Sequence, residues 1–195
     1  MEIKKLKPIL EALFAASDKP LSVNFISDLF TGDIEQPSKD DIRQSINELM
    51  TQYQESGMEI KQVASGFRLQ VKPAYEMWVS RLWEQKPPRY SRALMETLAL
   101  IAYRQPITRG EIEEIRGVSV SSNMIKTLQE REWVKTLGHK DVPGKPALFG
   151  TTKVFLDYFN LISLNDLPTL AEIRDLAQYH PELALSDIEE SSLPT

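Results

Sequence analysis

The 195-residue sequence predicts a mainly α-helical chain that contains two similar units, each with a small β-hairpin. When Pro106 is aligned with Pro20, an offset of 86, apolar and capping positions recur at matching places. The aligned pairs are Met95 with Ile9, Ala99 with Leu13, Leu100 with Phe14, Ile107 with Leu21, Thr108 with Ser22, Ile112 with Ile26 and Ile115 with Leu29. In each copy the apolar spacing then changes from that of a helix to the alternation of a strand. Three helices followed by a hairpin predict tandem winged-helix domains.

The first unit is predicted to contain three helices and one hairpin. Apolar residues at helical spacing are Leu6, Ile9, Leu10, Leu13 and Phe14, then Phe25, Ile26 and Leu29, which are expected to form the buried side of the second helix, then Ile42, Ile46, Leu49, Met50 and Tyr53. Ser22 stands where it can cap the second helix, Ser38 opens the third, and Gly57 ends the third. Phe67, Leu69 and Val71 then alternate with polar residues, so we expect a strand that a turn at residues 64–66 joins to residues 58–60.

The second unit repeats this order. Thr108 and Glu111 form a capping box at the start of its second helix, and Gly117 ends that helix. A third helix is expected from about Ser121 to Glu132, with hairpin strands at 134–137 and 147–151 around a proline-bounded turn.

The segments outside the two units are a linker and a tail. Tyr75, Trp78, Val79 and Leu82 predict a linker helix that Pro87-Pro88 ends. The expected domains are therefore 1–86 with the linker helix, 87–168, and an acidic tail at 169–195 in which a short helix bears Leu170, Ile173 and Leu176.

Composition narrows the possible functions. No apolar run approaches the roughly 20 residues that cross a bilayer, no secretory signal pattern is present, and cysteine is absent, so a cytoplasmic protein is expected. Residues 1–88 carry 11 Lys and Arg against 13 Asp and Glu, residues 89–165 carry 11 against 8, and residues 166–195 carry 1 against 7. Any contact with nucleic acid is therefore expected in the middle third, and to be weak and salt-sensitive.

Catalytic and cofactor sites are not indicated. The two histidines, His139 and His180, have no partner at the spacing of a metal site or an acid-base pair. Glu111 and Glu114 share one helix face near its N-terminus, where negative charge stabilises the helix dipole. We therefore expect no enzyme activity, no metal and no cofactor.

One family resemblance is carried mainly by residues 87–168. Its residues are Arg89-Tyr90-Ser91-Arg92, Glu96-Thr97-Leu98-Ala99, the run from Ile101 to Arg109, the run from Glu111 to Val118, Val142-Pro143-Gly144-Lys145-Pro146, Gly150-Thr151-Thr152 and the run from Ser163 to Pro168. The first unit adds the run from Glu11 to Ser17, Lys19-Pro20-Leu21-Ser22 and Gly66-Phe67-Arg68-Leu69. In these residues the chain resembles the ScpB family, segregation and condensation protein B.

The resemblance implies a non-enzymatic scaffold subunit of the bacterial SMC condensin complex, associated with the nucleoid. Members form homodimers, chiefly through the N-terminal winged helix, and bind the kleisin ScpA, which bridges the SMC heads. For this chain the resemblance implies dimerisation through the first unit, and the large apolar groups Phe30, Trp78 and Trp83 are candidate interface residues.

The helix from Ser91 to Arg104 is a candidate kleisin site. At 100° per residue, Leu94, Leu98 and Ile101 face the core, while Tyr103 and Leu100 extend apolar character round the back. That back is covered either by other parts of the chain or by kleisin, with Leu100 and Tyr103 as anchors and Arg104 and Arg109 at the rim.

A tandem winged-helix transcription regulator is the alternative function. A regulator would present a basic reading helix in each unit, yet Lys39 and Arg43 are outnumbered by Asp40, Asp41 and Glu48. In the second unit the candidates for weak DNA contact are Lys126, Arg131, Lys140 and Lys145. Charge therefore favours the scaffold.

Overall fold

The computed structural model describes residues 3–82 and 90–169, which fall into two compact units. Among these residues, those up to Ser91 and Lys153–Ser163 form the first unit, and Arg92–Thr152 with residues 164–169 form the second. No helix in the described part of the chain is both long and apolar enough to cross a membrane.

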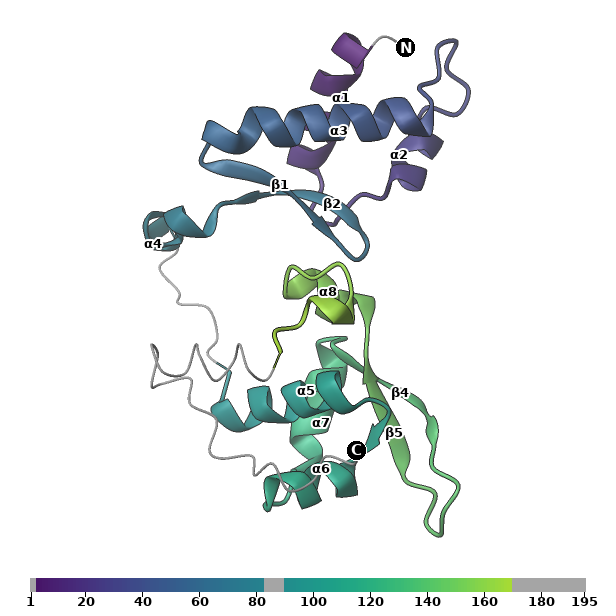
Figure 1. The fold of residues 1–195 in the computed structure, drawn as a ribbon, viewed down its shortest axis with the longest axis vertical. Helices are drawn as coiled ribbons and strands as arrows, with labels where there is room; N and C mark the ends of the chain where they lie inside the picture. The colour runs from purple at the N-terminus through teal and green to yellow at the C-terminus, as the bar shows by residue number, and fades with distance from the viewer. Residues whose placement is uncertain (1–2, 83–89, 170–195) are drawn as a thin grey trace. The chain divides into compact units, whose positions relative to one another are not determined.

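The first unit packs three helices against a hairpin (Figure 1). The helices are α1 (Ile3–Ala16), α2 (Val23–Leu29) and α3 (Lys39–Gln52), and strands β1 (Met58–Val63) and β2 (Gly66–Val71) pair antiparallel. The core consists of Leu6, Leu10, Phe14, Leu21, Ile26, Phe30, Ile42, Ile46, Leu49 and Ile60. The winged-helix prediction is confirmed by this order of elements.

The predicted cap at Ser22 and the predicted start of the third helix at Ser38 are confirmed. Ser22 accepts the amide hydrogen of Phe25 at 3.1 Å, and Ser38 forms a capping box with Asp41. The predicted buried side of α2 is wrong at two of three positions, because Phe25 is 51% exposed and Leu29 is 49% exposed. These two lie four residues apart on one stripe, so only Ile26, one position round the helix, faces the core.

A short bridge ties the hairpin to the start of α2. The amide of Leu21 donates to the carbonyl of Phe67 at 2.8 Å, and the amide of Phe67 donates back at 2.9 Å. The preceding Gly66 has φ +146°, and a Cβ at that position would lie 2.3 Å from the carbonyl oxygen of Leu21. The close approach of the two backbones therefore requires glycine.

The second unit repeats the plan. It contains α5 (Arg92–Arg104), α6 (Arg109–Arg116), α7 (Ser122–Glu130) and a sheet of β3 (Ile107–Thr108), β4 (Val134–His139) and β5 (Ala147–Thr151) in the order β3-β5-β4. Its buried apolar residues include Leu98, Ile101, Ile112, Leu128 and Trp133. The capping box at Thr108 and the end of α6 at Gly117, which has φ +66°, are confirmed. Strand β3 was not expected, and it corresponds to the Leu21 bridge of the first unit.

The offset of 86 holds for only part of the repeat. Leu21 and Ile107 are both buried, as are Ile26 and Ile112. In the first helices, however, buried Leu6, Leu10 and Phe14 correspond to buried Leu94, Leu98 and Ala102, an offset of 88. The pairing of Leu100 with Phe14 is therefore wrong, because the connection that follows the helix is two residues shorter in the second unit.

Residues 153–163 belong to the first compact unit, whereas the sequence pattern predicts a domain at 87–168 that includes them. They contain α8 (Lys153–Tyr158), and three hydrogen bonds join them to the hairpin β1–β2. The amide of Ala64 donates to the carbonyl of Leu161 at 2.9 Å, that of Ser65 to Asp157 Oδ1 at 2.9 Å, and the Arg68 guanidinium to Asn160 Oδ1 at 2.7 Å.

Within the described part of the linker, residues 73–82, the predicted helix is divided into short turns. The segment α4 (Glu76–Val79) is α-helical there, and it lies between two 3-10 turns at Pro73–Tyr75 and Ser80–Leu82. Trp83 and Pro87-Pro88 lie outside the described residues, as does the tail helix predicted at Leu170, Ile173 and Leu176.

Candidate partner-binding surfaces

Helix α5 has one buried face and one outer face. Leu94, Leu98 and Ile101 are buried, as the helical angles predict. On the outer face Leu100 is half-buried, Tyr103 is 39% exposed and Arg104 is exposed. The predicted core positions Leu94, Leu98 and Ile101 are therefore confirmed, while Thr97, a polar residue not expected in the core, is buried as well.

The chain itself reaches this outer face of α5. The hydroxyl of Tyr103 donates a hydrogen bond to the carbonyl of Pro168, which follows the 3-10 turn Leu164–Asp166. Part of the cover that the apolar back of α5 needs thus comes from its own unit. What remains accessible is an edge formed by Leu100, Tyr103 and Arg104, here called the α5 outer face.

An ion-pair chain fixes α5 against α6. Glu96 contacts Arg92 at 2.9 Å and Arg116 at 3.0 Å, and the Arg116 side chain is nearly buried. Burial acts to raise the pKa of Glu96, but the hydrogen bonds from Arg92 and Arg116 outweigh it, so this pKa lies below its usual value. Arg116 also donates to Thr97 at 3.2 Å. The ion pairs of Glu96 therefore hold α5 against α6, and they do not involve Leu100, Tyr103 or Arg104 on the outer face of α5.

Arg109 is held by its own helix and by the start of α7. Its Nε contacts Glu113 at 2.9 Å, and its Nη1 donates to Ser122 Oγ at 2.9 Å. Glu113 in turn accepts the amide hydrogen of Val120 at 2.8 Å, and that bond and Arg109 lower the pKa of Glu113. These contacts bind Arg109 to α6 and α7 and do not join it to Tyr103 on α5.

Two of the four cations predicted to touch DNA are already paired. Lys140 contacts Glu111 at 2.6 Å, and Lys126 contacts Glu130 at 3.5 Å. The Arg131 guanidinium lies 5.7 Å from the centre of the Trp133 ring, and Lys145 is exposed on the wing. Paired lysines neutralise phosphates less effectively, so these contacts reduce the cationic character of the predicted DNA surface.

Acid is expected to weaken the link between Lys140 and Glu111. The Lys140 ammonium, with the capping bonds at Thr108, lowers the pKa of Glu111 from 4.5 to about 2. A carboxylate whose pKa is lower in the folded state stabilises the fold above its unfolded pKa, and this contribution disappears as pH falls toward 2. Lys140→Met should therefore lower stability at pH 7 by less than about 1 kcal/mol, since the pair is partly exposed.

Urea denaturation of wild type and Lys140→Met from pH 7 to pH 3 measures this effect. The gap in unfolding free energy should narrow below about pH 4.5, where Glu111 begins to be protonated in the unfolded chain. Lys145→Met removes a wing lysine for which the described residues show no ion pair, and it serves as the control. A gap that stays constant with pH would contradict this account of the pair.

The predicted dimer residues of the first unit occupy different environments. Phe30 is only 6% exposed and belongs to the core, so its size is explained by packing within its own unit. Trp78 is 56% exposed and lies 6.3 Å from the ring of Tyr75. Further exposed apolar residues of this unit, none of them predicted to lie at the dimer interface, include Phe25, Leu29, Ile34, Met77 and Leu82.

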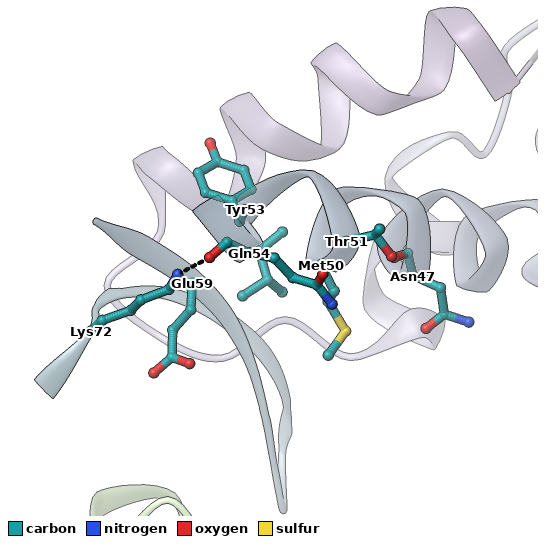
Figure 2. A pocket seen from close by; sticks show the side chains of 8 residues that line it. Asn47, Met50, Thr51, Tyr53, Gln54, Glu59 and Lys72 are labelled. Atoms are coloured by element: carbon teal, nitrogen blue, oxygen red, sulfur yellow. Dashed lines mark hydrogen bonds between the residues drawn. The ribbon is translucent and has the colours of Figure 1, made fainter. Parts of the chain in front are cut away.

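The first unit also has a shallow hollow of about 490 Å³ between the end of α3 and the hairpin. It is lined by Asn47, Met50, Thr51, Tyr53, Gln54, Glu59, Ile60 and Lys72 (Figure 2). Lys72 Nζ donates to the carbonyl of Gln54 at 2.6 Å, which ties the end of β2 to the turn after α3. Figure 2 shows the polar side chains of Asn47 and Glu59 well apart and not converging on one point. The arrangement therefore does not indicate a ligand site, and the Lys72 bond to Gln54 has a structural role.

Metal-binding clusters of His, Cys, Asp and Glu are absent from the part of the chain that the structure describes. His139 is exposed on β4, and His180 lies outside the described residues.

Comparison with known proteins identifies the family. The family model described as Segregation and condensation complex subunit ScpB matches residues 8–170. A segregation and condensation protein B homolog of Coxiella burnetii is 54% identical over 92% of this chain and 87% of its own length. Segregation and condensation protein B of Syntrophotalea carbinolica is 39% identical over 91% of this chain and 88% of its own.

Two crystal structures are also similar. ScpB from Mycobacterium tuberculosis is 26% identical with a TM-score of 0.39, over 82% of this chain and 97% of that one. A dimer of an ScpB N-terminal domain complexed with ScpA peptide is 26% identical with a TM-score of 0.36, over 45% of this chain and 100% of that one. The resemblance seen in the sequence is confirmed by the family match and by the curated relatives: this chain belongs to the ScpB family of segregation and condensation complex subunits.

Proposed function

We propose that this chain is a non-enzymatic scaffold subunit that binds the kleisin ScpA as a homodimer and serves chromosome condensation and segregation at the nucleoid, in the cytoplasm. The observation that carries the proposal is the family match over residues 8–170, together with 54% identity to a curated relative. Contact with SMC is then indirect, through ScpA.

The charges on the third helix of each unit support a scaffold over a regulator. In α3 of the first unit, Asp40 and Asp41 stand at the helix start, where a DNA-reading helix meets phosphates. In α7, Lys126 is paired with Glu130. A charge pattern of this kind is suited to protein partners, and DNA contact through residues 89–165 is expected to be weak and lost at raised salt.

Affinity capture from cells tests the function. A tagged copy of this chain should recover ScpA and, with it, SMC, and removal of ScpA from the cells should abolish recovery of SMC but leave the tagged chain intact. Recovery of SMC without ScpA would contradict the proposed order of contacts. Enrichment of one DNA sequence at physiological salt would instead favour the transcription regulator.

For kleisin we propose the α5 outer face as the site, with Leu100 and Tyr103 as anchors and Arg104 at the rim. An interface with apolar anchors inside a polar rim is the usual plan for protein partners. Arg109, which the sequence grouped with these residues, is kept as a candidate rim residue, and its contacts with Glu113 and Ser122 hold it on α6 and against the start of α7.

The double variant Leu100→Glu with Tyr103→Ala is expected to weaken ScpA binding by about 1 to 2 kcal/mol, the scale of losing interface anchors. Isothermal titration measures the affinity, and circular dichroism checks the fold. Because Leu100 is half-buried, its replacement by Glu could disturb the fold as well as the interface. Arg104→Glu, at an exposed position, is therefore the second variant. Val118→Glu, at an exposed apolar residue elsewhere in the second unit, is the control. Unchanged affinity in both folded variants would place kleisin elsewhere.

The dimer is proposed to form through the first unit, where Trp78 remains a candidate and Phe30 is explained by the core. Light scattering of the full chain should give twice the 22.3 kDa protomer mass at tens of micromolar. Trp78→Glu should shift the mass toward the protomer, and Val118→Glu should not. A wild-type protomer mass at these concentrations would refute the dimer.

A further inference from the structure

The α5 outer face lies where the described part of the second unit ends. Tyr103, in the last turn of α5, donates to the carbonyl of Pro168, and the description ends one residue later at Thr169. Residues 170–195 therefore start beside Tyr103. A segment tethered this closely to a surface meets it at an effective concentration in the millimolar range.

Charge on the two sides is complementary. Arg104 is exposed, and it forms no ion pair with any residue of the described ranges. Residues 170–195 contain six Asp and Glu against one Arg. The segment that begins at this face thus carries the charge that Arg104 attracts.

The apolar pattern is complementary as well. Leu170, Ile173 and Leu176 recur at a spacing of three residues, which places them on one side of a helix, and Thr169 with Glu172 can cap it. Eight helical residues extend about 12 Å, which is two turns of α5 and enough to pass from Tyr103 over Leu100. In the sequence, an apolar stripe with acidic neighbours therefore begins directly after the residue that contacts the α5 outer face. That face is apolar at Leu100 and Tyr103 and carries the exposed Arg104.

We propose that residues 170–177 dock on the α5 outer face in cis, with Leu170, Ile173 and Leu176 against Leu100 and Tyr103. The tail then occupies the surface assigned above to kleisin, and ScpA must displace it, so the tail is an autoinhibitory segment. This second half of the inference rests on the proposed function, whereas the docking itself does not.

Cysteine labelling tests the docking, since the chain contains no cysteine of its own. The single variant Leu100→Cys is alkylated with a maleimide in the full chain and in a chain that ends at Thr169. A tail docked about 80% of the time leaves the thiol open about a fifth of the time, so alkylation should be about fivefold slower in the full chain. Asp141→Cys, exposed on the wing, should react equally fast in both lengths.

A matched pair of tail substitutions identifies the contact. Ile173→Asp added to Leu100→Cys should restore the fast rate, and Leu193→Asp, near the end of the chain, should not. Circular dichroism of each variant checks that the fold is retained. Raised salt should also speed the reaction. Equal rates in full and shortened chains would overturn the docking, and so would protection that grows with protein concentration, which would indicate a second copy.

Titration with purified ScpA tests the regulatory half. Removal of residues 170–195 should tighten ScpA binding by about the same factor of five. If neither length binds ScpA, the proposed function fails while the labelling still decides the docking. If both lengths bind equally although the tail protects Leu100→Cys, autoinhibition is refuted.

Discussion

Replacement of Gly66 by alanine is expected to lower the free energy of unfolding of the first unit by about 3 kcal/mol, at the upper end of the usual cost of a strained backbone. The residue has φ +146°, and its Cβ would lie 2.3 Å from the carbonyl oxygen of Leu21. To relieve that clash the hairpin must move away and lose the paired bonds between Leu21 and Phe67. Chemical denaturation followed by circular dichroism measures the loss.

Gly57→Ala is the matched control for this substitution. Its new Cβ would meet the ring of Tyr75 at 3.7 Å, which is an ordinary contact. We expect a change within about 1 kcal/mol, because alanine mainly restricts the unfolded chain at such a position. Similar losses at the two glycines would show that the close approach at Leu21 does not constrain the hairpin.

Trp133→Ala is expected to destabilise the second unit by about 3 to 5 kcal/mol, the range for truncating a large buried aromatic residue. Trp133 is 2% exposed and lies just before β4, and its carbonyl accepts the amide hydrogen of Thr152 at 3.1 Å. Because the chain has two compact units, denaturation of the variant should show two transitions. The transition of the second unit should move to lower denaturant concentration, and that of the first unit should stay where it is in the wild type.

The controls for Trp133 separate volume from position. Trp133→Phe keeps most of the buried volume, so it should lose less than the alanine variant. Trp78→Ala removes a tryptophan that is more than half exposed and should cost under about 1 kcal/mol in unfolding free energy. A Trp133→Ala chain as stable as wild type would contradict the assignment of this ring to the core.

The elements that sequence predicted best are those specified by local chemistry. A serine or threonine three residues before its partner amide fixes a helix start, as at Ser38 and Thr108. Gly117 ends α6 in the left-handed conformation, which glycine adopts without strain. The buried arc of α5 follows from spacing alone, since the helical period decides which side chains share a face.

Features that depend on distant contacts were not predictable in the same way. The hydrogen bond between Ser65 and Asp157 joins residues 92 positions apart, and nothing in either local pattern indicates it. The two-residue shift between α1 and α5 arises in the connection after the helix, where no periodicity exists. Phe25 and Leu29 were expected in the core because they are apolar. The short helix α2 turns the face that carries Ile26 to the core, however, and Phe25 and Leu29 lie on a neighbouring stripe that is about half exposed.

The candidate surface was predictable only in part. Leu100, Tyr103 and Arg104 were found from the angles of one helix, and the structure shows them at the surface or half-buried. The pairing of Lys140 with Glu111 depends on the wing folding back toward α6, and so the sequence could not reveal that this cation is neutralised.

The most direct test of the central claim is a titration of the purified full-length chain with purified ScpA at physiological salt. The account predicts saturable binding that the Leu100→Glu, Tyr103→Ala variant weakens by about 1 to 2 kcal/mol and that Val118→Glu leaves unchanged. Absence of any binding between the folded wild-type chain and ScpA would contradict it.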